Sequence, residues 1–345
     1  GKDGPAEAVT GALDSYLTNL PKGYGVTKVE DLLTLLAEQD VVLLDIREVS
    51  EYEAGHMEGS FNVPIRTLTQ NLNLLPDTSA TIMVICKGGA RASLAAAALQ
   101  VLGYEDVRIL AGGFDAWAGE ELPVITEAVV VEPGTAPEFD AEVFAAVDAY
   151  LSNLPEGFGL VSSANLAAEL VENPPYLLDV RSAEEFGKEY IEGANHIWIE
   201  ELWGRINELP EDKATPIVVY CASGYRGGIA AVALNLLGYT NVRNLSGGLN
   251  AWKVAELPIV AAFDLNTRLG EFLAAQPDTF NALRASDFKA ELDAAAELTI
   301  VDVRTADEYA EGHVAGAFNV PLGELTDHLD LLPNLDANIV IYCGS

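Results

Sequence analysis

Short apolar runs alternate with longer amphipathic segments along this chain. In the runs at residues 41–44 and 81–85, apolar side chains occupy successive positions, which is typical of strands buried on both faces of a parallel sheet. Residues 92–102 instead carry apolar side chains at helical spacing, and Gly103 follows as a helix stop. The alternation of strands and helices predicts an α/β layered domain.

The same pattern occurs three times. Each copy has an Asp-x-Arg triplet at the end of an apolar run and, further along, a cysteine that ends a second apolar run. The cysteines of successive copies are 135 and 122 residues apart, so each repeat is a whole domain and not a solenoid unit. These landmarks are Asp45 and Cys86, Asp179 and Cys221, and Asp302 and Cys343.

These landmarks predict two complete domains and one incomplete one. The first covers residues 1–126, a linker follows at 127–137, the second covers 138–262 and the third 263–345. The third stops in its loop, two residues after Cys343, and lacks the helix and strand that follow in the other copies. We therefore expect the natural chain to continue past its last residue, and Cys343 to be inert in this form.

An additional helical segment precedes each copy. Residues 6–20 match residues 139–154, and both segments run into the same Asn-Leu-Pro-x-Gly sequence. Residues 265–275 are a weaker third version. We expect these preface helices to pack on their own domain or between neighbouring domains.

The charge of the chain limits its partners. It has 19 Lys and Arg against 53 Asp and Glu, a net charge of −34, which argues against binding to nucleic acid or to an anionic membrane surface. No run of 18 apolar residues is present, so we predict no membrane span. The acidity and the start at Gly1 favour the periplasm or cell envelope, with the cytoplasm as the alternative.

Two of the three cysteines open a loop of small residues that ends in arginine. A strand that ends at cysteine and turns through such a loop into a helix gathers backbone N–H groups around one sulfur. This arrangement predicts a lowered thiol pKa and an anion-binding cradle. We take both cysteines as candidate nucleophiles and the other loop residues as the candidate substrate-binding site. The loops are Cys86, Lys87, Gly88, Gly89, Ala90 and Arg91 in the first copy, and Cys221, Ala222, Ser223, Gly224, Tyr225 and Arg226 in the second.

Together these motifs resemble the rhodanese-like sulfurtransferase family. The resemblance rests on the Asp-x-Arg triplets, the Gly-His-x-x-Gly-x-x-Asn-x-Pro stretches at residues 55–64 and 312–321, the Cys-x4-Arg loops, and the Gly-Gly-x3-Trp endings at Trp117 and Trp252. It covers nearly all of the first two copies and the first part of the third. The second copy departs from it, with Glu189-Tyr190 where the others have Gly-His.

The resemblance implies a fold and an activity. The fold is a small parallel sheet with helices on both faces, repeated in tandem. The activity is transfer of a sulfane sulfur from a small sulfur-containing anion, such as thiosulfate, to a thiophilic acceptor through a persulfide on Cys86 or Cys221. It implies no metal and no organic cofactor, and it leaves a protein acceptor open.

Two other functions stay open at this point. One is a rhodanese-like module that binds partners without catalysis, in which the cysteines are only small buried hydrophobes. The other is a cysteine phosphatase, although that class has Cys-x5-Arg, usually after a histidine, and the cysteines here follow Ile85 and Tyr220. A Cys–His hydrolase is disfavoured, because no histidine neighbours either cysteine in the sequence.

The two complete sites are expected to differ. Lys87 adds positive charge to the first loop, so small dianionic donors should favour Cys86. The ring of Tyr225 is expected to form a wall of the second pocket, whereas Ala90 leaves the first more open. Asp45 and Arg47 are expected to form an internal hydrogen-bond network.

Overall fold

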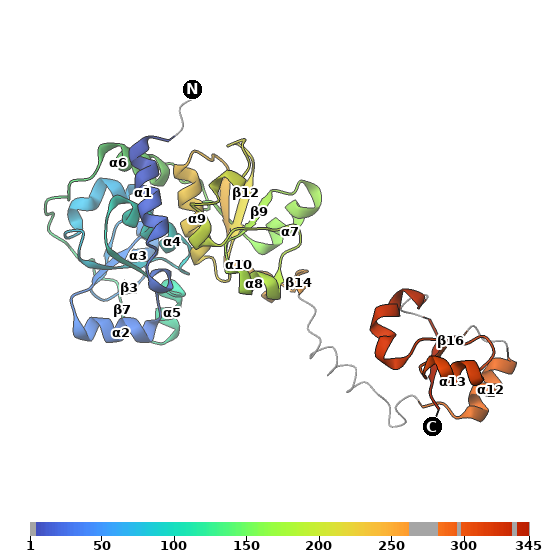
Figure 1. Cartoon of the computed structure of the whole chain (residues 1–345). Helices are drawn as coiled ribbons and strands as arrows, with labels where there is room; N and C mark the ends of the chain where they lie inside the picture. Colours follow the sequence, from blue (N-terminus) through green and yellow to red (C-terminus); the bar gives the residue numbers. More distant parts are fainter. Residues whose placement is uncertain (1–4, 262–281, 295–297, 333–336, 345) are drawn as a thin grey trace. The chain divides into compact units, whose positions relative to one another are not determined.

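The computed structural model describes residues 5–261, 282–294, 298–332 and 337–344 (Figure 1). The chain forms two compact units, Gly1–Ala262 and Phe263–Ser345. The first compact unit contains both complete copies of the repeat. The expected third preface helix at residues 265–275 lies outside the described residues.

The first copy is built on a five-stranded parallel sheet of order β1-β6-β5-β2-β4. A short antiparallel pair, β3 with β7, lies beside it. The strands are β1 (Val26–Thr27), β2 (Val42–Asp45), β3 (His56–Met57), β4 (Phe61–Asn62), β5 (Thr81–Ile85), β6 (Asp106–Leu110) and β7 (Val124–Ile125). The helices are α1 (Glu7–Thr18), η1 (Lys22–Gly25), α2 (Val29–Glu38), α3 (Val49–Glu53), η2 (Ile65–Leu74), α4 (Ala90–Leu102) and α5 (Gly113–Gly119).

The second copy repeats this topology, with parallel order β11-β9-β12-β13-β8. Its antiparallel pair is β10 with β14. The strands are β8 (Leu160–Val161), β9 (Tyr176–Asp179), β10 (Glu189–Tyr190), β11 (Asn195–His196), β12 (Ile217–Tyr220), β13 (Val242–Leu245) and β14 (Val260–Ala261). The helices are α6 (Ala141–Ser152), α7 (Ser163–Glu172), α8 (Ala183–Lys188), η3 (Ile199–Glu201), η4 (Ile206–Glu208), α9 (Tyr225–Leu236) and α10 (Gly248–Val254).

Both faces of each sheet are buried, as the continuous apolar runs predict. Successive residues of a strand point to opposite faces. In β5, Met83 and Ile85 pack into a cluster that includes Trp117. Val84 and Cys86 pack on the other face, in a cluster that also contains Cys221 and its neighbours from the second copy. One hydrophobic core therefore joins the two copies, and both candidate nucleophiles border it.

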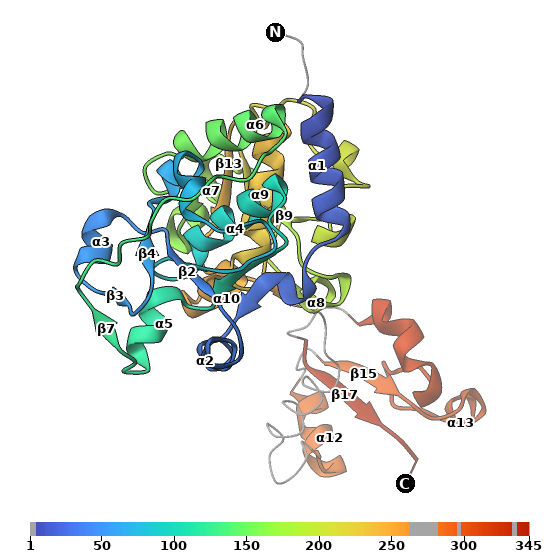
Figure 2. The same ribbon diagram turned by 90° about the vertical axis from the view of Figure 1, so that its left-hand side faces the viewer.

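Helices α4 and α9 make the central contact between the copies (Figure 2). Their backbones approach closely at Gly228 of α9. A Cβ at this position would lie 2.0 Å from Oγ of Ser93 in α4, so only glycine fits. Both helices include the last two residues of a candidate loop, and Gly89 and Gly224 are their left-handed N-cap residues. The two loops are thus carried by one tightly packed helix pair.

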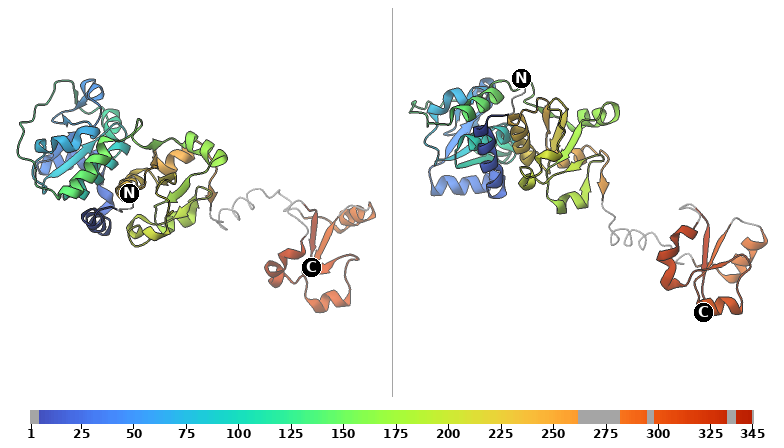
Figure 3. Two further views of the ribbon diagram at one scale, coloured as in Figure 1. Left: turned by 90° about the horizontal axis from the view of Figure 1, so that it is seen from above. Right: turned by 45° about the horizontal axis from the view of Figure 1, so that its top comes forward.

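The two preface helices contact both copies, so both of the expected placements, on the own domain and between neighbouring domains, are found. Helix α6 packs against η2 and α4 of the first copy, and α1 contacts η3 of the second. In the right-hand view of Figure 3, the dark blue helix α1 lies where the two copies meet. The prefaces also contact each other. Each preface therefore reaches the copy that it does not precede.

The third copy forms a three-stranded parallel sheet of order β16-β15-β17. Its strands are β15 (Thr299–Asp302), β16 (Phe318–Asn319) and β17 (Ile339–Tyr342), and its described helices are α12 (Ala285–Asp293), α13 (Ala306–Glu311) and η5 (Leu322–Leu331). This order matches β4-β2-β5 of the first copy. Strand β17 lies at an edge, and Ile341 is 55% exposed. In the part of the chain that the structure describes, no helix is long and apolar enough to cross a membrane.

Candidate active site

Each candidate loop turns backbone amides toward its cysteine sulfur. In the first copy the N–H groups of Gly89 and Ala92 donate to Sγ of Cys86, at N···S distances of 3.0 and 3.4 Å. In the second copy Gly224 N–H donates to Sγ of Cys221 at 3.2 Å. Each cysteine is 1% exposed. Such amides stabilise negative charge on sulfur once it forms.

The expected lowering of the thiol pKa is wrong for Cys86. Burial raises the pKa of this thiol, and the loop amides and the Arg91 charge oppose the shift only in part. Removing a sulfur from water disfavours its charged form, and this cost is the largest effect at the site. The sequence showed the amides and the arginine but not the extent of burial.

The raised pKa predicts how Cys86 responds to pH. Below the thiol pKa the thiolate fraction falls about tenfold for each pH unit, and the thiolate is the nucleophile. Sulfur loading of Cys86 should therefore rise with pH up to its ordinary pKa of 9.0 and continue to rise above it. The measurement is the loading rate between pH 6 and 10 in the Cys221→Ser chain. A plateau reached by pH 7 would contradict the direction of the shift.

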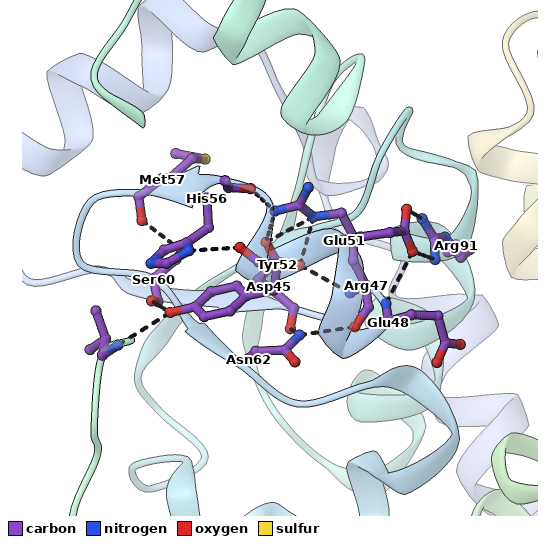
Figure 4. Close-up of polar contacts among 12 residues, drawn as sticks. Asp45, Arg47, Glu48, Glu51, Tyr52, His56, Met57, Ser60, Asn62 and Arg91 are labelled. Carbon is purple, nitrogen blue, oxygen red and sulfur yellow. Dashed lines mark hydrogen bonds and ion pairs between the residues drawn. The ribbon is translucent and has the colours of Figure 1, made fainter. Parts of the chain in front are cut away.

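The loop arginines are held by glutamates from a preceding helix. Arg91 donates from both terminal nitrogens to Glu51 of α3, each at 2.7 Å (Figure 4). Arg226 makes the same two-pronged contact with Glu185 of α8, at 2.6 and 2.8 Å. These hydrogen bonds lower the pKa of Glu51 and bring that of Glu185 to about 2. The arginines therefore remain ion-paired at neutral pH.

The sequence reasoning missed these two glutamates as site residues. The available signal was positional, since Glu51, Glu185 and Glu308 recur at the same place in all three copies. Each also closes the first turn of its helix by accepting the N-cap amide, from Glu48, Ser182 and Thr305 respectively. One carboxylate thus fixes the helix start and, in the first two copies, the arginine.

A second buried ion pair supports the strand next to each loop. Arg47 donates through Nε to both Asp45 carboxylate oxygens at 3.0 Å and through Nη2 to Gly55 O at 2.8 Å (Figure 4). Asn62 Nδ2 donates to the backbone carbonyls of Asp45 and Arg47, both at 2.9 Å. Asp45 is fully buried, and the guanidinium is nearly so. The expected internal Asp/Arg network is confirmed.

The remaining loop residues occupy three kinds of environment. Lys87, Gly88 and Ser223 are exposed at the mouths of the loops. Ala90, Ala222 and Tyr225 are half-buried. Gly89 and Gly224 are buried, with φ of 93° and 94°, a conformation that favours glycine.

Tyr225 lies against the loop of the other copy. Gly112 N–H, in the first copy, donates to Tyr225 Oη at 2.9 Å. A Cβ at Gly89 would lie 2.6 Å from Cε1 of the same ring. Burial raises the Tyr225 pKa, and negative charge on Cys86 or Cys221 raises it further. Tyr225, expected beside its own cysteine alone, also packs on the loop of the first site.

This packing predicts that Gly89 cannot be replaced. In Gly89→Ala the left-handed backbone costs about 1–2 kcal/mol, and the new Cβ meets the Tyr225 ring, so loading of Cys86 should fall about tenfold or more. The measurement is the rate of persulfide formation at each cysteine by peptide mass mapping. Gly88→Ala is the matched control, because no atom lies within 4 Å of its added Cβ. Equal effects of the two substitutions would refute this account.

Comparison with known proteins identifies the family of the chain. The rhodanese-like domain family matches residues 28–120, 163–255 and 284–345, which is more than half of the chain. The chain belongs to the rhodanese-like family. Its described residues contain no group of three or more His, Cys, Asp or Glu side chains placed to hold a metal ion.

Named relatives in the family include sulfurtransferases. A sulfurtransferase of Allochromatium vinosum is 35% identical over 102 residues, covering 29% of this chain and 94% of the relative. The thiosulfate sulfurtransferase PspE of Escherichia coli is 34% identical over 89 residues, 26% of this chain and 86% of the relative. The crystal structure of a Pseudomonas aeruginosa thiosulfate sulfurtransferase is 25% identical over 92% of this rhodanese-like chain, with a TM-score of 0.29. The chain spans 61% of that protein's length.

Proposed function

We propose that this protein is a sulfurtransferase that carries a sulfane sulfur as a persulfide on Cys86 and on Cys221. The observation that carries the proposal is the amide cradle, because Gly89 and Gly224 aim their N–H groups at a buried sulfur. A persulfide is an anion, and fixed N–H donors in a water-poor site stabilise it without reorganisation. Membership of the rhodanese-like family supports the same chemistry.

The reaction has two steps. The cysteine thiolate attacks the outer sulfur of a donor such as thiosulfate, a new S–S bond forms at Sγ, and the donor's own S–S bond breaks with its electron pair leaving on sulfite. An acceptor nucleophile then attacks the outer sulfur of the persulfide, and the cysteine leaves as a thiolate. No metal or organic cofactor takes part in either step.

The ion pairs disfavour the phosphatase alternative. Glu51 accepts one hydrogen bond from each terminal nitrogen of Arg91, and Glu185 does the same at Arg226, so the end-on pair of donors of each guanidinium is not open to a phosphate. We propose that the arginines act as fixed positive charges beside the sulfur. A binding module without catalysis would need neither the cradle nor the paired arginines.

Mass spectrometry of the whole chain tests the proposal. Incubation with thiosulfate should add one sulfur atom at Cys86 and one at Cys221, and cyanide should remove both and release thiocyanate. Aryl phosphate hydrolysis, run in parallel, should not exceed the rate without enzyme. If no donor adds sulfur to either cysteine, the binding module becomes the better interpretation.

A further inference from the structure

Four residues after each preface segment lies an aromatic residue held in a strained backbone conformation. Tyr24 lies between Gly23 and Gly25, and Phe158 between Gly157 and Gly159. Their φ angles are 59° and 60°, in the left-handed region. Large side chains avoid this region at a cost of about 1–2 kcal/mol, so contacts elsewhere must hold the two rings in place.

Phe158 belongs to the second copy, but its ring lies over arginines of the first. The ring centre is 4.3 Å from Cζ of Arg66 and 5.0 Å from Cζ of Arg91. Arg66 also donates to the carbonyls of Leu154 and Pro155, at 3.0 and 2.8 Å. Hydrogen bonds from the first copy therefore hold the end of the second preface. They keep the ring of Phe158 over Arg91, the loop arginine of the Cys86 site.

Tyr24 makes the reciprocal contact, from the first copy to an arginine of the second. We call these two contacts, Phe158 with Arg91 and Tyr24 with Arg226, the crossings. Its ring centre is 5.5 Å from Cζ of Arg226, and its hydroxyl donates to Oε1 of Glu200 at 3.0 Å. Both partners belong to the second copy. Glu200 lies four residues after the end of β11, and Arg66 lies four residues after the end of β4, so the two residues are equivalent in position. The two contacts thus differ in the second charged partner of the ring, which is Arg66, itself paired with Glu48, at Phe158 and the carboxylate of Glu200 at Tyr24.

We propose that Phe158 is a positioning residue of the Cys86 site and Tyr24 a positioning residue of the Cys221 site, so that each copy completes the active site of the other. This inference rests on the proposed sulfur-transfer function. An aromatic face over a guanidinium, with the carboxylate of Glu51 or Glu185 on its nitrogens, fixes the position of the charge of the loop arginine.

The difference between the crossings also assigns donor classes. At the first site the crossing ring lies over Arg66 and Arg91, and Lys87 is exposed at the loop mouth. At the second site, the hydroxyl of Tyr24 donates a hydrogen bond to the carboxylate of Glu200. Small dianionic donors are therefore taken by the Cys86 site, and donors of lower negative charge by the Cys221 site.

The test measures each cysteine separately in the full chain. Phe158→Leu keeps an apolar side chain but removes the aromatic face, which is worth about 0.5–2 kcal/mol, so thiosulfate loading of Cys86 should slow about 2- to 30-fold. Loading of Cys221 should stay within about twofold in that variant, since its own crossing is intact. Tyr24→Leu should give the opposite pattern, and Phe158→Tyr should restore loading of Cys86.

Phe139→Leu is the matched control. Phe139 precedes α6, and its ring packs against Tyr104 of the first copy at 5.9 Å between centroids, so it is a crossing aromatic away from the loop arginines. It should leave both loading rates unchanged. If Phe158→Leu slows both cysteines equally, or if the control has the same effect, the crossing residues are only structural and the proposal is wrong.

A second readout does not depend on sulfur transfer. The pH profile of iodoacetamide alkylation, mapped by peptide mass, reports the thiolate at each cysteine. Phe158→Leu should move the Cys86 profile to higher pH and leave the Cys221 profile in place. Tyr24→Leu should move the Cys221 profile and leave the Cys86 profile in place. If the wild-type protein loads no sulfur but each variant moves the alkylation profile of only its own cysteine, the proposed function is wrong and the positioning role of Phe158 and Tyr24 is supported. If sulfur loads normally in every variant and no profile moves, the crossing fails alone.

Discussion

Replacing Cys86 and Cys221 together with serine should reduce sulfur transfer from thiosulfate to cyanide by roughly 10³-fold or more. A serine hydroxyl is not ionised at neutral pH and forms no persulfide, so both steps of the reaction lose their nucleophile. Each single variant should keep the transfer that the other loop performs, because each cysteine has its own amide donor and its own paired arginine. The measurement is thiocyanate release at saturating thiosulfate.

Cys343→Ser is the control for this experiment. Cys343 is exposed at the end of β17, at the edge of the third sheet, and should contribute nothing. The double variant should also melt at the wild-type temperature, since serine is close to cysteine in size. Transfer that survives in the double variant and vanishes with Cys343→Ser would move the active site to the third copy.

Asp179→Asn should destabilise the first compact unit by about 3–5 kcal/mol. Asp179 is fully buried and Arg181 is 3% exposed, and the guanidinium donates to the carboxylate through Nε at 3.0 Å and Nη2 at 2.6 Å. Asparagine preserves the shape but removes the charge, which leaves the arginine buried without compensation. Urea unfolding followed by tryptophan fluorescence measures the loss.

Fluorescence is a suitable probe because the four tryptophans lie at positions 117, 198, 203 and 252, all in the first compact unit. Glu184→Gln is the control, since it breaks an exposed ion pair with Lys188. The side chain of Glu184 is 81% exposed and that of Lys188 is 71% exposed. Solvent already screens that pair, and the unfolding midpoint should not move. A midpoint shift of the same size in both variants would show that burial is not the cause.

Much of the fold was predictable because its signals are local. The continuous apolar runs before Cys86 and Cys221 determine strands covered on both faces, and Gly103 ends α4 in a left-handed conformation. The triplets at Asp45 and Asp179 are self-contained, since each aspartate binds an arginine two residues away. Such features need only a few neighbouring residues, so sequence is sufficient to read them.

The missed features of the site all depend on how distant segments meet. Nothing near Tyr225 indicates that its hydroxyl accepts a hydrogen bond from Gly112, because that contact exists only once α4 and α9 have packed. The raised Cys86 pKa is a balance between burial and amide donors, and burial is a property of the assembled core. The repeated Glu51 and Glu185 were visible in sequence, but their partners lie about forty residues further on, as their separations of 40 and 41 show.

The close approach of α4 and α9 has a mechanical consequence. Gly228 of α9 and Ser93 of α4 are in direct contact, so the two helices cannot shift past each other without a steric clash. The apolar core that the two copies share opposes a hinge motion between them. The two cysteine loops therefore keep a fixed separation. In the sulfur transfer proposed above, donor and acceptor would meet two preformed loops, and the reaction would need no opening or closing of one copy against the other.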